Sequence, residues 1–484
     1  MQSRRLSATR YALYRTTLII YRYIQALNED PDIILGGRSY DPAPFAGFCL
    51  HKGIAPGTAW HMGKIMECGG ICAVPKGRSM IATMRKDSFD LTPLSPIERC
   101  TPLSVAAHTL YEKTRPDRLP GPGGILHLDE ARYEQLIDGR TVRVTDAKFV
   151  PSPIYQVKLE GVERLGHRTI FIGGVRDPIL ISQIDEFLQS VREYTQRLYP
   201  ELDKSESCRL VYHVYGKNAV MGPLEAASGV SHELGVMGEV IAPTKEESHA
   251  IANNVRTSLL HMPYSGQLAT TGNFASPLSP HEQDAGEVFR FSLYHLIDLQ
   301  PGQETSLFPI TQHVLDGAAT LDATQQRLTQ QERDALLEAK PRILGEFTRN
   351  AMNSISTRGI SNNLFMVYDT AQKPLPAGEA AMMDIASVVR SKNSGPFELT
   401  LDIMFDNEES YKRVKAANVL GNEVIKNLYQ VQDDDILVNM YFDPAMAWKC
   451  TLKRQWAQGS FGERDTLGTQ QHAPLLGVRV PVVR

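Results

Sequence analysis

Hydrophobic positions along the chain recur with two different periods, and each period predicts its own kind of element. An apolar run at 32–35 stops at Gly36-Gly37, and Asp41-Pro42 then opens a segment with helical spacing that ends near Gly53. Because Asp caps helices well and Pro fits the first helical turn, Asp41-Pro42 predicts a helix start. This order of residues predicts a strand, a tight turn and a helix.

The same order of residues returns later in the chain. An apolar run at 169–172 is followed by Gly173-Gly174, Arg176 and Asp177-Pro178. Apolar residues between 181 and 191 then recur with helical spacing. Two such units predict an α/β main domain, built on a mixed or parallel sheet with flanking helices.

The C-terminal part of the chain alternates with a period of two. Residues 397–405 read as a strand with one solvated face. Helical spacing follows at 411–417 and 423–428, and strand-like runs follow at 436–442 and 448–452. The order predicts a smaller α+β domain, for which the ferredoxin-like fold is the candidate arrangement.

These patterns divide the chain into three parts. We expect a basic leader at 1–30, the α/β domain at 31–375, with a polar connector helix at 321–337, and the C-terminal domain at 376–484. Five arginines precede the first acid of the leader: Arg4, Arg5, Arg10, Arg15 and Arg22. That composition is typical of a mitochondrial presequence, but a basic helix ahead of a domain is the interpretation that we favour, and targeting is the alternative. We therefore expect a cytoplasmic protein, with the mitochondrial matrix as the alternative location.

Composition narrows the classes of partner. The 484 residues carry 51 Lys and Arg against 55 Asp and Glu, and this balance excludes a protein-wide basic field for nucleic acid. No apolar run approaches the ~18 residues of a membrane span. Six cysteines are too sparse for a disulfide framework, which favours a reducing compartment. We expect binding neither to nucleic acid nor to a membrane.

The two glycine-containing units suggest a function. Glycines let the backbone approach a ligand, a helix N-terminus attracts anions, and arginine binds carboxylate or phosphate with two hydrogen bonds. The candidate substrate-binding residues are Gly36, Gly37, Arg38, Gly173, Gly174 and Arg176. The alternative is two ordinary strand–helix turns whose arginines pair with local carboxylates. No GxGxxG follows a strand and no Walker motif is present, so nucleotide-fold fingerprints are absent.

A second group of polar residues recurs with helical spacing. His61 and Lys64 lie on one face of a predicted helix with Glu67 beside it, and we predict that these three residues are catalytic. The alternative is a buried histidine with satisfied hydrogen bonds, next to packed thiols. Cys68 and Cys72 have no metal-site spacing with His61, because glycines interrupt the helix that would align them, so we predict no metal.

Two further groups are weaker candidates. Ser104 and His108 lie four residues apart, but no nucleophile elbow surrounds the serine, and a helix N-terminal turn is the simpler interpretation. His232-Glu233 lacks the second histidine of a zinc protease motif.

Several long motifs resemble a known family. Residues 37–45, 61–69, 100–113, 119–124 and 174–178 are similar to the acyclic terpene utilisation (AtuA-like) family. Residues 390–400 and 470–476 resemble a small domain of unknown function that accompanies this family, fused or as a separate polypeptide. The resemblance covers most of the chain from about Asp32 onward. Relatives have a longer segment before the part that matches 32–45, so the chain looks N-terminally shortened.

The resemblance implies bacterial catabolism of citronellol- and geraniol-type branched chains through coenzyme A thioesters, and it carries over no catalytic residues. We therefore expect an enzyme of branched-chain or acyclic terpenoid acid metabolism, acting as a hydratase, lyase or isomerase on a small anionic substrate. Arg38 and Arg176 would bind the carboxylate or thioester, and coenzyme A enters only as part of the substrate. The sequence requires no cofactor. Alternatives are a non-catalytic subunit of a complex and an accessory or tailoring protein of a secondary-metabolite pathway. A homo-oligomer and a partner subunit both stay open.

Overall fold

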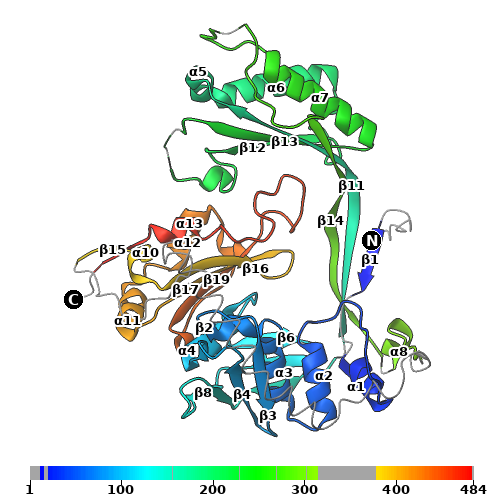
Figure 1. The fold of residues 1–484 in the computed structure, drawn as a ribbon, viewed down its shortest axis with the longest axis vertical. Helices are drawn as coiled ribbons and strands as arrows, with labels where there is room; N and C mark the ends of the chain where they lie inside the picture. The colour runs from blue at the N-terminus through cyan, green and yellow to red at the C-terminus, as the bar shows by residue number, and fades with distance from the viewer. Residues whose placement is uncertain are drawn as a thin grey trace, which may run out of the picture. The chain divides into compact units, whose positions relative to one another are not determined.

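The computed structural model describes residues 11–15, 20–313 and 378–481, apart from the single positions 155, 228, 230, 269 and 301. The described residues up to 304 and from 378 belong to one compact unit. All strand pairs in these ranges are antiparallel, so the prediction of a mixed or parallel sheet is wrong. The molecule combines helices with antiparallel sheets and has a distinct C-terminal domain (Figure 1). The predicted connector helix at 321–337 lies outside the described residues.

The N-terminal lobe, residues 20–151, packs helices against small sheets around one hydrophobic core. Its helices are α1 (Ile20–Asn28), α2 (Ala43–His51), α3 (Pro56–Met66) and α4 (Pro102–Ala107), with the 3₁₀ turns η1 (Gly69–Cys72) and η2 (His108–Leu110). One sheet has the order β3 (Met80–Met84), β4 (Ser88–Pro93), β9 (Val142–Thr145), β8 (Arg132–Gln135). A second has the order β10 (Lys148–Pro151), β7 (Gly124–His127), β6 (Arg118–Gly121), and β2 (Ala73–Val74) pairs with β5 (Arg99–Cys100). Helix α1, from the predicted leader, buries Ile20 and Tyr23 in this core.

In the first predicted strand–turn–helix unit, at 32–53, the helix is confirmed and the strand is wrong. Helix α2 follows Asp41-Pro42 as predicted. Residues 32–35 form no strand, and Ile33 and Leu35 are 82% and 97% exposed. Apolar side chains alone do not make a strand, because the backbone also needs a neighbouring strand to bond.

The central lobe, residues 156–298, is built on long antiparallel strands covered by helices. Its sheet has the order β1 (Tyr11–Arg15), β11 (Gln156–Val175), β13 (Leu234–Ala242), β12 (Arg209–Tyr215), and β14 (Glu282–Asp298) also pairs with β11. The helices are α5 (Pro178–Ser182), α6 (Ile184–Leu198) and α7 (Lys245–His261), and η3 (Gly222–Leu224) lies in a connection. Helix α8 (Gln303–Leu307) follows this lobe.

The second predicted unit also differs from expectation. Asp177 caps α5 as predicted, since its Oδ1 accepts from the amides of Ile179 at 2.7 Å and Leu180 at 3.3 Å. Gly173 and Gly174 do not form a turn, because they lie inside β11 opposite Val236 and Gly235 of β13. A Cβ at Gly173 would lie 2.4 Å from the Phe274 ring. The glycine is therefore required by close packing.

The C-terminal domain confirms the predicted order of elements. Its sheet has the order β16 (Val388–Asn393), β17 (Glu398–Met404), β19 (Ala447–Lys453), β18 (Ile436–Phe442), with helices α11 (Glu408–Ala417) and α12 (Asn422–Tyr429) between the two hairpins. Shorter elements complete it: β15 (Ala380–Ala381), α10 (Met382–Ile385), η6 (Asp433–Asp435), η7 (Asp443–Ala445), α13 (Ala473–Leu476) and β20 (Arg479–Val480). The ferredoxin-like arrangement is wrong, because that fold alternates βαββαβ whereas both hairpins here are unbroken.

The two faces of this sheet have different surroundings. Leu401, Ile403 and Trp448 face the core that the helices cover. Their neighbours along the strands, Asp402 and Lys449, point to the opposite face. Small apolar clusters join the domain to the rest of the unit: Leu110 packs with Phe442 and Ala445, and Phe461 packs with Ile241 and Val288.

Candidate active site

The buried polar residues of the N-terminal lobe begin on α3. Every residue from Gly57 to Ile65 is buried, because glycines allow the helix to approach its neighbours closely. A Cβ at Gly63 would lie 2.8 Å from the Pro42 carbonyl oxygen at the start of α2. His61 and Lys64 therefore point into the interior and are 0% and 1% exposed.

Lys64 forms an ion pair with Glu67, one helical turn further along the chain. The side chain of Glu67 is 10% exposed, so its carboxylate has lost most of its hydration. Burial raises the pKa of Glu67, although the charge and hydrogen bond of Lys64 act in the opposite direction. A carboxyl group with a raised pKa can both accept and return a proton near neutral pH.

A second pair lies beside the first. The Lys113 ammonium donates to the Tyr40 hydroxyl oxygen at 2.8 Å and lies 4.6 Å from the centre of the Tyr40 ring. Burial lowers the pKa of Lys113 and raises the pKa of Tyr40. The charge of Glu67 acts on both of these residues. The four side chains thus form one electrostatically coupled group.

Two buried histidines, His61 and His108, lie in the interior near Lys64. No hydrogen-bond partner among the described residues reaches either ring nitrogen of His61 or His108. The His61 ring contacts Phe89 and Tyr133 edge-on, with ring centroids 5.5 and 6.0 Å away. Burial lowers the pKa of His61 to about 3. The pKa of His108 is also lowered, mainly by burial and then by the charges of Lys64 and Arg390. Both imidazoles are therefore neutral at physiological pH.

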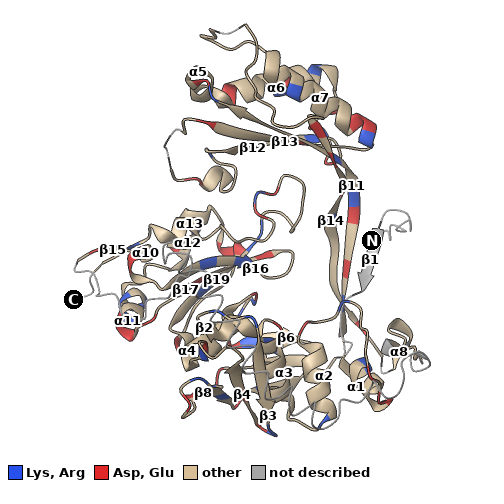
Figure 2. Cartoon of the chain, viewed as in Figure 1, with Lys and Arg blue, Asp and Glu red and all other residues tan. Residues whose placement is uncertain are grey.

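The C-terminal domain contributes cations to the same region. Arg390 on β16 lies 5.5 Å from the centre of the Tyr111 ring, and Lys392 pairs with Glu112 at 3.3 Å (Figure 2 marks the basic positions on β16). Nε of Arg390 donates to Asp402 at 3.0 Å, whereas its buried Nη2 has no partner in the described parts of the chain. The segment at 108–114 thus lies between α3 and β16.

Lys449 fastens this segment to the C-terminal sheet. Its ammonium is fully buried and donates to the Leu110 carbonyl oxygen at 2.7 Å and to Asp402 at 2.9 Å. Thr451 Oγ1 donates to the Thr114 carbonyl oxygen at 2.9 Å. The C-terminal domain therefore positions the chain segment that carries His108 and Lys113.

The group has one open side and one buried side. Tyr40, Glu67 and Lys113 are partly exposed, whereas His61 and Lys64 are not. We name these five residues together with His108 and Arg390 the proton-transfer cluster, after the role that we propose for them below. Its ammonium and guanidinium groups outnumber its single carboxylate, which favours an anionic ligand.

The predicted catalytic residues thus fall in one region. Lys64 and Glu67 form a pair, and His61 lies one turn before Lys64 on the same helix. Ser104 is the third residue of α4 and forms a capping box with Thr101: its hydroxyl accepts from the Thr101 amide at 3.0 Å and donates to the Cys72 carbonyl oxygen at 2.7 Å. This confirms that Ser104 lies in the N-terminal turn of a helix.

The predicted anion-binding residues are divided between two lobes. Arg38 is 73% exposed and lies 3.4 Å from Asp41, whose charge acts on Tyr40 and Glu67, so Arg38 borders the proton-transfer cluster. A Cβ at Gly36 would lie 2.3 Å from the Tyr23 hydroxyl oxygen, and Gly37 faces open space.

The second predicted cradle lies in the central lobe. Arg176 is exposed and follows β11. The carboxylate of Asp177 already occupies the N-terminus of α5 and also accepts from the Tyr264 hydroxyl at 2.6 Å. Val175, next to Arg176, packs in the central core, whereas Tyr40 packs against the N-terminal core. No described contact joins the two predicted cradles.

Sequence reasoning missed Tyr40, Lys113 and Arg390. Tyr40 and Lys113 lie inside the motifs at 37–45 and 100–113, on which the expected resemblance to the AtuA-like family rests, and Arg390 lies inside the motif at 390–400 of the small accompanying domain. That clustering in long motifs was the available signal. Over the described ranges, no group of three His, Cys, Asp or Glu side chains is placed to hold a metal ion, and no helix is long and apolar enough to span a membrane.

The fold and the cluster define a protein of mixed helices and antiparallel sheets, with buried acid–base groups where a small C-terminal domain contacts the N-terminal lobe. That domain has a known family: a domain of unknown function (DUF4387) matches residues 382–479. This agrees with the small accompanying domain expected from the sequence. Neither the curated proteins nor the solved structures contain a significant match to the chain.

Proposed function

We propose that the chain is an enzyme that transfers protons on a branched-chain or acyclic terpenoid acid, or on its coenzyme A thioester. The observation that carries the proposal is the buried Lys64–Glu67 pair beside the Tyr40–Lys113 pair. Groups with shifted pKa values concentrate at catalytic sites because burial adjusts them to their task. The reaction class is an isomerisation, hydration or elimination, in which a carbon atom next to a carbonyl group gains or loses a proton.

Glu67 has the properties of the general base. Its carboxylate takes the proton from the substrate carbon and returns it to another position, so an isomerisation balances without a co-reactant. Negative charge then develops on the carbonyl oxygen of the substrate. The Tyr40 hydroxyl, which accepts from Lys113, would donate to that oxygen.

The remaining residues bind the substrate anion or position Glu67. Lys64 holds the Glu67 carboxylate in place and limits the rise of its pKa. Arg390 has an unpartnered Nη2 among the described residues and would bind the substrate anion, with Arg38 at the border. In this proposal the DUF4387 domain contributes a binding residue to a site in the N-terminal lobe. His61 would act by filling the buried side, because burial lowers its pKa to about 3 and makes its imidazole a weak base.

The test is the turnover of unsaturated branched acyl-coenzyme A thioesters by purified protein. In Glu67→Gln, kcat falls about 10²–10⁴-fold, since the amide cannot accept the proton. Arg390→Gln raises KM more than it lowers kcat. Glu134→Gln, an exposed position on β8, is the matched control and keeps full activity. Circular dichroism confirms that each variant is folded.

The proposal fails if folded Glu67→Gln retains wild-type turnover. A wild-type protein that turns over none of these thioesters, and that copurifies with a stoichiometric partner from its native cell, would instead support the non-catalytic subunit.

A further inference from the structure

A cavity lies on the other side of the C-terminal sheet from the proton-transfer cluster. Its volume is about 380 Å³, within the usual range for small-molecule sites. Leu399 and Leu452, paired across β17 and β19, form part of its wall. Thr451, the neighbour of Leu452, bonds instead to Thr114 of the N-terminal lobe. Successive strand residues face opposite sides, so the sheet separates the two sites.

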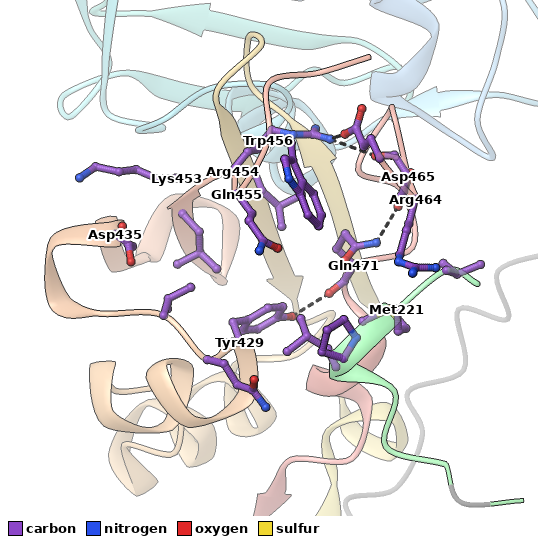
Figure 3. A pocket seen from close by; sticks show the side chains of 18 residues that line it. Met221, Tyr429, Asp435, Lys453, Arg454, Gln455, Trp456, Arg464, Asp465 and Gln471 are labelled. Carbon is purple, nitrogen blue, oxygen red and sulfur yellow. Dashed lines mark hydrogen bonds and ion pairs between the residues drawn. The ribbon is translucent and has the colours of Figure 1, made fainter. Parts of the chain in front are cut away.

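Two arginines line this cavity, which we name the Trp456 pocket (Figure 3). The Arg454 side chain is 9% exposed, pairs with Glu463 and donates from Nη2 to the Asp465 carbonyl oxygen at 3.0 Å. Its buried Nη1 has no partner in the described residues. Arg464 donates from Nη1 to the carbonyl oxygens of Asn218 and Ala219 and forms no ion pair within the described ranges. The guanidinium charge of Arg464 is thus not neutralised by any described carboxylate.

The carboxylates of the pocket are occupied by protein donors. Asp465 accepts from the amides of Thr469 and Gln470 and from Nε2 of Gln471, at 2.8–3.1 Å. Glu463 pairs with Arg454 and accepts from the Gly459 amide at 2.6 Å. Asp435, the third acid of the lining, accepts from the Gln432 amide at 3.0 Å. Lys453, Arg454 and Arg464 balance the charge of the three carboxylates, and Arg464 and Nη1 of Arg454 keep donors that a ligand anion can use.

Aromatic and apolar surface completes the pocket. Trp456 is 40% exposed and points into the cavity, and Tyr429 lies across from it with its hydroxyl bonded to the Gln471 carbonyl oxygen at 2.9 Å (Figure 3). Met221 and Leu224 from the central lobe cover another side. A large exposed indole beside guanidinium groups suits a flat ring that carries a negative charge.

We propose that the Trp456 pocket binds an organic anion with an aromatic ring, whose phosphate or carboxylate is held by Arg454 and Arg464 while the ring stacks on Trp456. This site is independent of the proton-transfer cluster, so its test does not depend on turnover. The ligand would bridge the C-terminal domain and the loop at 218–224, because Arg464 already bonds to that loop.

Tryptophan fluorescence and titration calorimetry can test this proposal on the full chain. Trp456 is the only exposed one of the three tryptophans, since Trp60 and Trp448 are 5% and 0% exposed. Two anionic probes, AMP and benzoate, distinguish phosphate from carboxylate recognition. At least one of them quenches the fluorescence and binds about tenfold or more tightly than its neutral counterpart, adenosine or benzamide. Octanoate, an anion without a ring, binds more weakly than the preferred aromatic anion.

Variants locate the binding. Arg464→Gln and Trp456→Ala each weaken binding about tenfold or more, and Arg454→Gln does the same if it folds with Glu463 left unpaired. Arg197→Gln, an exposed position on α6, leaves the affinity unchanged, and so does Glu67→Gln in the proton-transfer cluster. The proposal is overturned if neither aromatic anion binds at millimolar concentration, if octanoate binds equally well, or if Arg464→Gln and Trp456→Ala bind like the wild type.

Discussion

The molecule contains two groups of buried polar and charged side chains. They differ in whether all of their polar atoms have hydrogen-bond partners, and we call the first group complete and the second incomplete. In the first group, Asp402 on β17 and Lys449 on β19 are buried on one face of the C-terminal sheet. Lys449 donates to Asp402 and to the Leu110 carbonyl oxygen, and Asp402 also accepts from Arg390. In the second, the proton-transfer cluster, His61 and His108 have no partner among the described residues. Burial alone therefore does not distinguish the two groups.

The difference is the reason why we propose different roles for the two groups. A fully bonded buried ion pair holds elements together and loses stability when one partner is removed. Buried polar atoms without partners cost free energy and persist where function requires them. Arg390 belongs to both groups, because Nε bonds to Asp402 while Nη2 has no described partner. It connects the complete group to the incomplete one.

Removing Lys449 is expected to have the largest effect on stability. Lys449→Met leaves Asp402 with Arg390 as its only described cationic partner and frees the Leu110 carbonyl oxygen. We expect a loss of about 3 kcal/mol in the free energy of unfolding, at the lower end for breaking a buried pair. Denaturant titration measures it. Lys412→Met is the control, since its pair with Glu408 is about 70% exposed on both sides, and should change stability by less than about 0.5 kcal/mol. Equal losses in both variants would contradict a structural role for Lys449.

Removing Lys64 is expected to cost less and to depend on pH. In Lys64→Met the raised pKa of Glu67 rises further, because the charge and hydrogen bond that lowered it are gone. The folded state then binds more protons than the unfolded state between the two pKa values of Glu67, so stability falls as pH rises through that window. We expect a loss of about 2 kcal/mol at pH 8 and a smaller loss at pH 5. Denaturant titrations at both pH values measure this loss. A loss of the same size at both pH values would show that the pKa of Glu67 does not rise in the variant.

The C-terminal domain was the part most open to prediction from sequence. The alternation at 397–405 and the later runs predicted β17, α11, α12, β18 and β19, because each pattern is local. Strand β16 was missed because it carries Arg390 and Lys392 on a surface that the N-terminal lobe covers. Polar side chains that pair with another lobe leave no apolar alternation to detect.

The candidate site was predictable only in part for a related reason. Lys64 and Glu67 are neighbours on one helix turn, so spacing was enough to place them together. Tyr40 and Lys113 are 73 positions apart, and their contact depends on how the segment before α2 and the segment after η2 pack. The two glycine units show the opposite problem: similar local sequence became a loop at Gly36 and strand interior at Gly173, because only one segment had partner strands.

His61 gives the smallest expected effect on stability and the sharpest test of the incomplete group. His61→Phe keeps the edge contacts with Phe89 and Tyr133 and removes two ring nitrogens that have no described partner. The added volume and the removed polar atoms act in opposite directions, so we expect a change within about 1 kcal/mol in the free energy of unfolding.

The pH profile of turnover tests the charge state of His61. With its pKa lowered to about 3, His61 stays neutral between pH 5 and 8, and the variant should keep the pH profile of turnover even if kcat falls. The exposed position His249→Phe supplies the surface baseline for denaturant titration. If a titration step between pH 6 and 7 vanished in His61→Phe, the imidazole would be a charged participant, and Glu67 would lose its place as the group that exchanges the proton.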